Sequence, residues 1–290
     1  MILRALKSHL LLFRINIALF AACSAFTGFL LVPSCRISGG FVPAFAVFLL
    51  ASGASALNQF QERDIDAKMQ RTRKRPLPSG AISPARALSL VMFLVTSGLA
   101  LLAYRAGTPA LALGLAALLW YNGLYTPLKK VTAFASIPGA VVGMFLPAIG
   151  WVSAGGALMD LRIAGFCFIM FLWQVPHFWL LLLARGEEYE QAGLPSLVAM
   201  MNREQLARVC YAWIFAATIA CLALPLYGSV GTPAIFFPLA AAGLWLLWSE
   251  RSLAGANAPL SPSPALFRNI NVYMFLVMSI LSFQNVISRT

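Results

Sequence analysis

The sequence has little charge for its length. Of its 290 residues only 10% are Asp, Glu, Lys or Arg, whereas 60% are hydrophobic and the mean hydropathy is +0.82. A soluble domain carries about 25% charged and about 45–50% apolar residues. The chain has too few polar side chains to cover a solvated surface, and too many apolar ones for a disordered or collagen-like chain. The composition therefore predicts a protein that crosses a membrane several times.

Cysteine and acidic residues are also scarce. The five cysteines show no CxxC spacing, so we expect free, buried thiols with no disulfide or metal role. Nine acidic residues stand against 21 Lys and Arg, and the formal net charge is +12. In a soluble protein this excess would suggest nucleic acid, but in a membrane protein the retention of Lys and Arg on the cytoplasmic side explains it. We expect the lipid bilayer as a partner and no nucleic acid.

Nine apolar runs are long enough to cross a bilayer, which takes about 20 residues in a helix. The runs are continuously apolar and lack the alternation of a membrane β-barrel. We predict an all-α polytopic membrane protein, a single domain over 1–290 with nine transmembrane helices around a central cavity. The predicted spans are 11–32, 41–60, 86–106, 108–127, 133–154, 161–184, 204–226, 230–248 and 266–287.

The basic residues predict the orientation. If the N-terminus is cytoplasmic, 17 of the 21 Lys and Arg residues lie on the cytoplasmic side of these spans. This excess predicts a multi-pass protein of the cytoplasmic (inner) membrane whose C-terminus lies outside. Eight of the nine acidic residues fall on the same side, although Asp and Glu hardly influence topology. The acidic clusters at 62–66 and 187–190 therefore suggest one shared site.

The first acidic cluster has regular spacing. Asn58, Glu62 and Asp66 are four residues apart, so they lie on one face of a helix that continues out of the membrane. Three oxygen ligands suit Mg²⁺, which takes one or two carboxylates together with waters and substrate phosphates. Arg71 and Arg75, also four apart, could clamp phosphate oxygens. The pattern indicates a diphosphate site, and the alternative is a solvated charged loop with weak ion pairs.

Other polar residues extend this cluster. Asp64 lies close to the acidic face, although not on it. Lys129 and Lys130 end a short loop, where they could face the same phosphates or serve only as a topology anchor. Glu187 and Glu188 follow the 161–184 span and could complete the metal site.

His177 is one of only two histidines. Seven uncharged residues follow it, which places it about two turns inside the membrane edge. An ionisable side chain at that depth favours a functional role. The alternative is a neutral imidazole that is hydrogen-bonded to a neighbouring helix.

These motifs resemble those of the UbiA superfamily of intramembrane prenyltransferases. Asn58-x3-Glu62-x3-Asp66, followed by Arg71-Thr72-x2-Arg75-Pro76, is similar to the family patterns NxxxDxxxD and RTxxRP, with Glu62 where the family usually has Asp. The resemblance covers most of the chain. Four segments resemble the haem-farnesylating branch: YNGLYTPLKK (121–130), PAIGW (147–151), WQVPHFW (173–179) and EEYEQAGLP (187–195).

The resemblance implies transfer of a farnesyl group from farnesyl diphosphate to a vinyl group of haem B, with Mg²⁺ as cofactor. It also implies haem A synthase or a terminal oxidase as assembly partners. The implied site residues are Asn58, Glu62, Asp66, Glu187 and Glu188 for the metal, Arg71, Arg75, Lys129 and Lys130 for the diphosphate, Asp64, Asp66, Lys129 and Lys130 for catalysis, and His177 and Tyr189 for haem.

Two alternatives stand beside this function. One is prenyl transfer to an aromatic quinone precursor. The other is a secondary transporter of an anionic substrate, although transporter sites typically lie near the bilayer midplane rather than in loops at its edge. A purely structural membrane subunit would not need two acidic loops.

Overall fold

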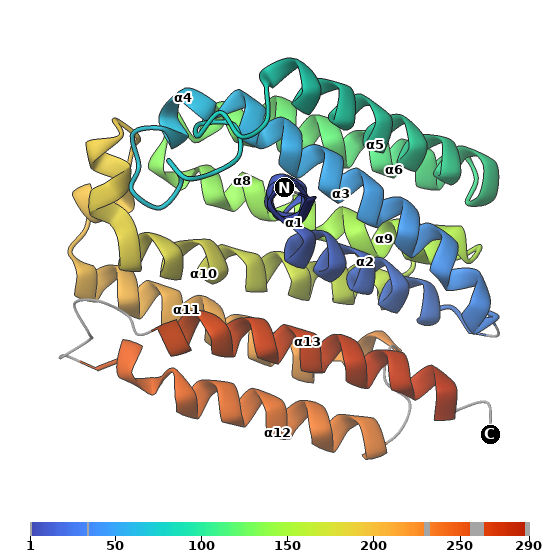
Figure 1. Cartoon of the computed structure of the whole chain (residues 1–290). Helices are drawn as coiled ribbons and strands as arrows, with labels where there is room; N and C mark the ends of the chain where they lie inside the picture. Colours follow the sequence, from blue (N-terminus) through green and yellow to red (C-terminus); the bar gives the residue numbers. More distant parts are fainter. Residues whose placement is uncertain (1, 34, 229–232, 256–263, 288–290) are drawn as a thin grey trace.

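The computed structural model describes residues 2–33, 35–228, 233–255 and 264–287. These residues form helices and turns with no strand, which confirms the all-α prediction. The long helices lie side by side as one bundle (Figure 1). They are α2 (Ile15–Leu30), α3 (Phe41–Gln61), α5 (Pro84–Arg105), α6 (Thr108–Leu118), α9 (Val142–Ser153), α10 (Leu161–Gln191), α11 (Arg203–Leu222), α12 (Pro233–Ser249) and α13 (Pro264–Ile287). α1 (Ile2–Phe13) precedes α2, and three short helices lie in the connections: α4 (Arg63–Asp66), α7 (Thr126–Leu128) and α8 (Ser136–Ala140).

The described residues support seven or eight of the nine predicted spans. Seven helical segments of the described residues are long and apolar enough to cross a membrane, and the bent pair α1–α2 makes an eighth. The remaining candidate, α12, has 17 residues. Its length of about 26 Å lies at the lower limit for a helix that crosses the roughly 30 Å hydrocarbon core. The count of nine is therefore not confirmed. Residues 230–232 of the predicted eighth span and the C-terminal residues 288–290 lie outside the described residues.

The predicted span 11–32 is broken rather than straight. α1 ends at Phe13 and α2 begins at Ile15, with an angle of 49° between them. Figure 1 shows α1 almost end-on, whereas α2 runs along the bundle. Between them Arg14 has φ 48° and ψ 55°, a left-handed conformation that is uncommon for residues other than glycine. No other non-glycine residue of the described ranges has a positive φ.

Small residues bring α2 and α9 into backbone contact. A Cβ atom added to Gly150 would lie 1.8 Å from the carbonyl oxygen of Ala25, and one added to Gly28 would lie 2.0 Å from that of Pro147. Helices in membranes use glycine in this way to approach closely. The pair therefore forms a fixed wall, from which Phe20 faces the interior of the bundle.

α10 is longer than the predicted span 161–184. The helix continues to Gln191, past a kink at Arg185, where φ is −144° and ψ is 18°. It also contains Pro176, which has no N–H group to donate to the preceding turn. One element thereby carries both His177 and the second acidic cluster.

Candidate active site

A cavity of about 610 Å³ lies inside the bundle, which agrees with the predicted central cavity. This volume is typical of small-molecule sites. Most of the lining is apolar and comes from α2, α3, α6, α9, α10 and α13. It includes Phe20, Val47, Leu50, Leu118, Leu146, Ile149, Met170, Trp173, Phe178 and Phe267. The cavity is therefore an apolar chamber whose few polar side chains determine what it can bind.

The first acidic cluster lies at one end of this cavity. α3 ends before Glu62, and α4 begins after it, so the predicted single helix is interrupted. The backbone nevertheless keeps its helical bonding, because Glu62 N donates to Asn58 O at 3.0 Å and Asp66 N donates to Glu62 O at 2.8 Å. Asn58, Glu62 and Asp66 consequently all line the cavity, as their spacing predicts.

Side-chain hydrogen bonds hold the C-terminal part of α3 against a π-helical segment, η2 (Leu119–Tyr125), and against the first residue of α7 that follows it. Asn58 Nδ2 donates to Thr126 Oγ1 at 3.1 Å, and Asn122 Nδ2 donates to Ala54 O at 3.0 Å. Since the amide nitrogen of Asn58 is engaged, its oxygen is the atom that can serve a ligand. Segments of π-helix are frequent at functional sites.

Two ion pairs hold the carboxylates of this cluster. Arg75 donates to Asp66 at 2.6 Å, with side chains that are 15% and 5% exposed. Lys129 pairs with Glu62. Burial lowers the pKa of Lys129, against the opposing effect of Glu62. Burial and the nearby charge of Arg14 likewise lower the pKa of Arg75, while Asp66 raises it. Both cations are thus held away from water, which strengthens their interaction with any anion that enters.

The two acidic loops meet at this end of the cavity. The backbone N–H of Arg71 donates to Glu188 Oε2 at 3.2 Å, across 117 residues of sequence. Arg185 lies 3.4 Å from the other carboxylate oxygen of Glu188. Arg71 and Tyr189 both line the cavity. The structure therefore brings the two loops together, as their position on one side of the membrane suggests.

Four of the predicted site residues lie outside the cavity lining. The side chains of Asp64 and Glu187 are 86% and 76% exposed, and Lys130 is also exposed. Glu188 reaches the lining only through the backbone of Arg71. These four lie outside the lining, whereas the other predicted site residues line the cavity.

The oxygen atoms at this end suit a hard cation. Among the described residues, no group of three or more His, Cys, Asp or Glu side chains is placed to hold a metal. Two carboxylates and one amide oxygen are present instead, from Glu62, Asp66 and Asn58. Mg²⁺ commonly takes one or two carboxylates and completes its shell with waters and substrate phosphates. The donor set therefore fits Mg²⁺ that arrives with a diphosphate, and it does not form a closed protein cage.

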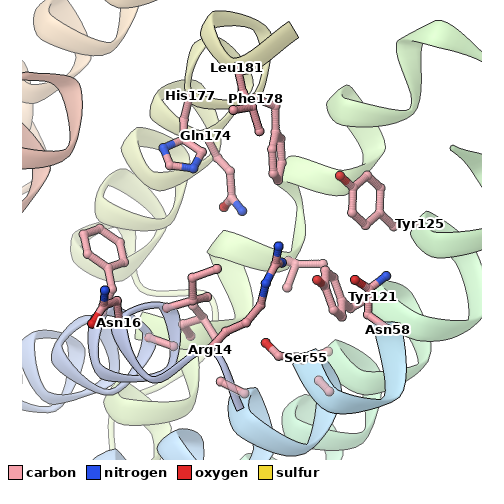
Figure 2. Close-up of a pocket in the computed structure, with 18 of the residues that line it drawn as sticks. Arg14, Asn16, Ser55, Asn58, Tyr121, Tyr125, Gln174, His177, Phe178 and Leu181 are labelled. Atoms are coloured by element: carbon pink, nitrogen blue, oxygen red, sulfur yellow. The ribbon is translucent and has the colours of Figure 1, made fainter. Parts of the chain in front are cut away.

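His177 lines the cavity on the side formed by α10. Its ring lies among aromatic rings, with centroids 4.7 Å from Phe267 and 5.0 Å from Trp173. The Nδ1 atom is buried and has no hydrogen-bond partner in the described part of the chain. Figure 2 shows His177 and Gln174 on one side of the cavity and Tyr121 on the other. The residue thus combines a place on the cavity lining with a buried nitrogen that no described protein group satisfies.

Sequence reasoning missed Arg14. Its side chain reaches into the cavity between α10 and Tyr121 (Figure 2). An arginine that precedes about 18 apolar residues within a long apolar run is the signal that could have identified it. Asn16, Gln174 and Asn271 also line the cavity and were not singled out.

Comparisons with known proteins agree on the family. The chain matches the model of the UbiA prenyltransferase family over residues 14–271. A protoheme IX farnesyltransferase of Geobacter sulfurreducens is 43% identical over 222 residues, which cover 77% of this chain and 82% of that relative. Another, from Oleidesulfovibrio alaskensis, is 36% identical over 279 residues and covers 96% and 95%.

Solved structures share the fold. A UbiA homologue from Aeropyrum pernix K1 has a TM-score of 0.74 at 21% identity, covering 95% of this chain and 99% of that one. A UbiA homologue from Archaeoglobus fulgidus bound to GPP and Mg²⁺ has a TM-score of 0.71 at 15% identity, covering 96% and 99%. The likeness extends over nearly the whole chain, so the helices around the cavity are arranged as in these proteins.

Proposed function

Since this chain belongs to the UbiA prenyltransferase family, we propose that it transfers a farnesyl group from farnesyl diphosphate to a vinyl group of haem B and so forms haem O. The haem acceptor rests on the relatives that are named protoheme IX farnesyltransferase. The main support for this reaction is that a single cavity joins an end lined by carboxylates and cations to an apolar interior that contains a histidine.

At the charged end the chain's own residues bind the diphosphate. Arg71, Arg75 and Lys129 lie on the lining, where their charges stabilise the leaving group. Asn58, Glu62 and Asp66 would hold Mg²⁺, which supplies further charge neutralisation for diphosphate departure. Entry of the donor requires that Arg75 and Lys129 exchange their carboxylate partners for phosphate oxygens.

The predicted site residues outside the lining have a different role in this proposal. Glu188 holds the backbone of Arg71 and so orients the loop that carries it. Asp64, Lys130 and Glu187 act through their charges from outside the lining rather than on the reacting atoms.

The reaction then follows from the shape of the cavity. The bond between farnesyl C1 and the diphosphate oxygen breaks, and the diphosphate keeps the electron pair. The vinyl carbon of haem attacks C1 and forms the new carbon–carbon bond. Water adds to the resulting cation and loses a proton, which gives the hydroxyethylfarnesyl group. The apolar walls, including Phe20 and Phe178, limit the access of water to the allylic cation.

The membrane setting fits these substrates. The chain is a multi-pass membrane protein, and we propose that its charged end lies at the cytoplasmic edge of the inner membrane, with the N-terminus cytoplasmic and the C-terminus outside. The basic excess on that side supports this orientation. A haem A synthase or a terminal oxidase would then receive the product as an assembly partner.

The direct test is an assay of the purified protein with haem B, farnesyl diphosphate and Mg²⁺, analysed by mass spectrometry. The expected product is haem O, and omission of Mg²⁺ should abolish its formation. Prenylation of an aromatic quinone precursor, with haem left unchanged, would contradict the proposal and favour the quinone branch of the family.

His177 tests the acceptor separately. Because its ring lines the cavity, His177→Ala should weaken haem binding by about tenfold, the equivalent of roughly 1.4 kcal/mol. Binding of farnesyl diphosphate should be nearly unchanged, since the diphosphate residues lie at the other end. The measurements are a haem titration by absorbance and a farnesyl diphosphate titration by calorimetry.

His9, the other histidine, provides the matched control because it lies outside the cavity lining. His9→Ala should bind both substrates as the wild type does. Equal losses of haem and farnesyl diphosphate in His177→Ala would show that His177 is a structural residue rather than a haem contact.

A further inference from the structure

Arg14 places a guanidinium in the cavity through an unusual backbone. Its left-handed φ of 48° and ψ of 55° end α1 and start α2 at an angle of 49°. Figure 2 shows the side chain extending from this break into the cavity, toward Tyr121. In a continuous helix the side chain of residue 14 would instead lie along the surface of that helix. Strained backbone of this kind persists where surrounding structure holds it, and it is concentrated at functional sites.

Arg14 lines the same cavity as three other cations, Arg71, Arg75 and Lys129. Figure 2 shows its guanidinium beside Tyr121, with Asn58 of the first acidic cluster beyond that ring. Arg14 therefore lies at the charged end of the cavity. Like charges repel one another, more strongly where water is scarce. An anion between them would turn this repulsion into attraction.

The carboxylates of the lining do not neutralise this group. The charged lining residues are four cations and two carboxylates. Asp66 is paired with Arg75, and Glu62 is paired with Lys129. Within the described ranges the guanidinium groups of Arg14 and Arg71 have no carboxylate partner, and Arg71 Nε is buried without a hydrogen bond. Two positive charges thus remain for a ligand, which matches a group with several negative oxygens.

We propose that Arg14 binds the diphosphate of the prenyl donor from the side opposite the loop that carries Arg71 and Arg75. This inference rests on the proposed function, because it assigns one more residue to the same donor site. As the C1–O bond breaks, the diphosphate gains negative charge, and the guanidinium stabilises it where it forms. The break between α1 and α2 serves to aim this side chain.

The test compares ligands rather than turnover alone. Arg14→Gln should weaken binding of a non-ionisable farnesyl thiolodiphosphate, with Mg²⁺ present, by about 10- to 100-fold, the range for loss of a charge-assisted hydrogen bond. Binding of neutral farnesol and of haem B should stay within about twofold of the wild type. Arg14→Lys keeps the charge but loses the planar guanidinium. Its affinity for the thiolodiphosphate should lie between those of the wild type and Arg14→Gln.

Two controls separate charge from folding. Arg86→Gln makes the same substitution at an exposed arginine that is outside the cavity lining, and it should leave all three affinities unchanged. Arg14→Asn places a residue that tolerates left-handed backbone at the break. It should melt no lower than the wild type and still lose thiolodiphosphate affinity.

Three results would overturn the inference. A loss of haem binding with intact thiolodiphosphate binding would assign Arg14 to the carboxylates of haem instead. Equal losses of every ligand, with a lowered melting temperature in Arg14→Asn, would make the residue purely structural. Unchanged thiolodiphosphate affinity in Arg14→Gln would refute this inference alone, whereas a wild type that binds no prenyl diphosphate would also refute the proposed function.

Discussion

Asp66 has two roles that one substitution should reveal together. Its carboxylate accepts a hydrogen bond from Arg75 at 2.6 Å, and it lines the cavity where we place the metal. Asp66→Asn keeps the size of the side chain and removes the charge. Arg75, 15% exposed, then stays next to Arg14 without its carboxylate partner.

The size of the effect follows from this burial. Removal of one partner from a buried ion pair costs about 3–5 kcal/mol, because the other charge is left uncompensated. Arg75 lies at the edge of a cavity, so we expect the lower end, about 3 kcal/mol. For a chain of this size that is a fall in melting temperature of about 6–12 °C. The double variant Asp66→Asn/Arg75→Gln removes both charges and should recover most of the loss.

Thermal unfolding in detergent and turnover with Mg²⁺ measure the two roles. The double variant should regain stability and remain inactive, since the metal ligand is still missing. Glu204→Gln is the control: it breaks an exposed pair with Arg208 at 3.9 Å and should shift the melting temperature by less than about 2 °C. If Asp66→Asn melts within 2 °C of the wild type, our account of the pair is wrong. If the double variant turns over normally, Asp66 is not a metal ligand.

Two further predictions concern the stability of the bundle. Glu250 is fully buried, and burial raises its pKa from 4.5 to about 7, so the folded state holds its proton more tightly than the unfolded state. The wild type should therefore lose stability as the pH rises from about 4.5 through about 7, by up to about 3 kcal/mol, whereas Glu250→Gln should show a flatter profile of melting temperature; parallel profiles would contradict this reasoning. Gly150→Ala should lower the melting temperature by an amount equivalent to at least 1–3 kcal/mol, because its Cβ would lie 1.8 Å from Ala25 O. Gly123→Ala, with nothing within 4 Å of the added Cβ, should not lower it.

Some features of the site could be predicted because they depend on local periodicity. The spacing of Asn58, Glu62 and Asp66 places them on one face whether or not the helix is continuous, since the hydrogen bonds across Glu62 keep the helical pattern. The helix positions follow from apolar runs, which leave little choice of structure in a membrane. The apolar runs predict the number of spans less well, because a 17-residue helix such as α12 lies close to the minimum length of a membrane-spanning helix.

Other features depend on geometry that the sequence does not show. Glu187 and Glu188 are adjacent, yet Glu188 accepts from the backbone of Arg71, whereas Glu187 is paired with Arg203 at 2.7 Å. The kink at Arg185 sets the rotation of that last turn, and no residue pattern predicts it. The left-handed conformation of Arg14 was also unpredictable, because glycine or asparagine is the usual signal.

The hydrogen bond between Arg71 and Glu188 also determines when the site can exist during synthesis. The two residues are 117 positions apart. At about 5–20 residues per second, the ribosome needs roughly 6–23 seconds to make the second after the first. For that interval the loop that carries Arg71 and Arg75 has been translated, while the acidic residue that orients it has not. The loop that carries Arg71 and Arg75 is therefore without this hydrogen bond in the growing protein until α10 has been inserted.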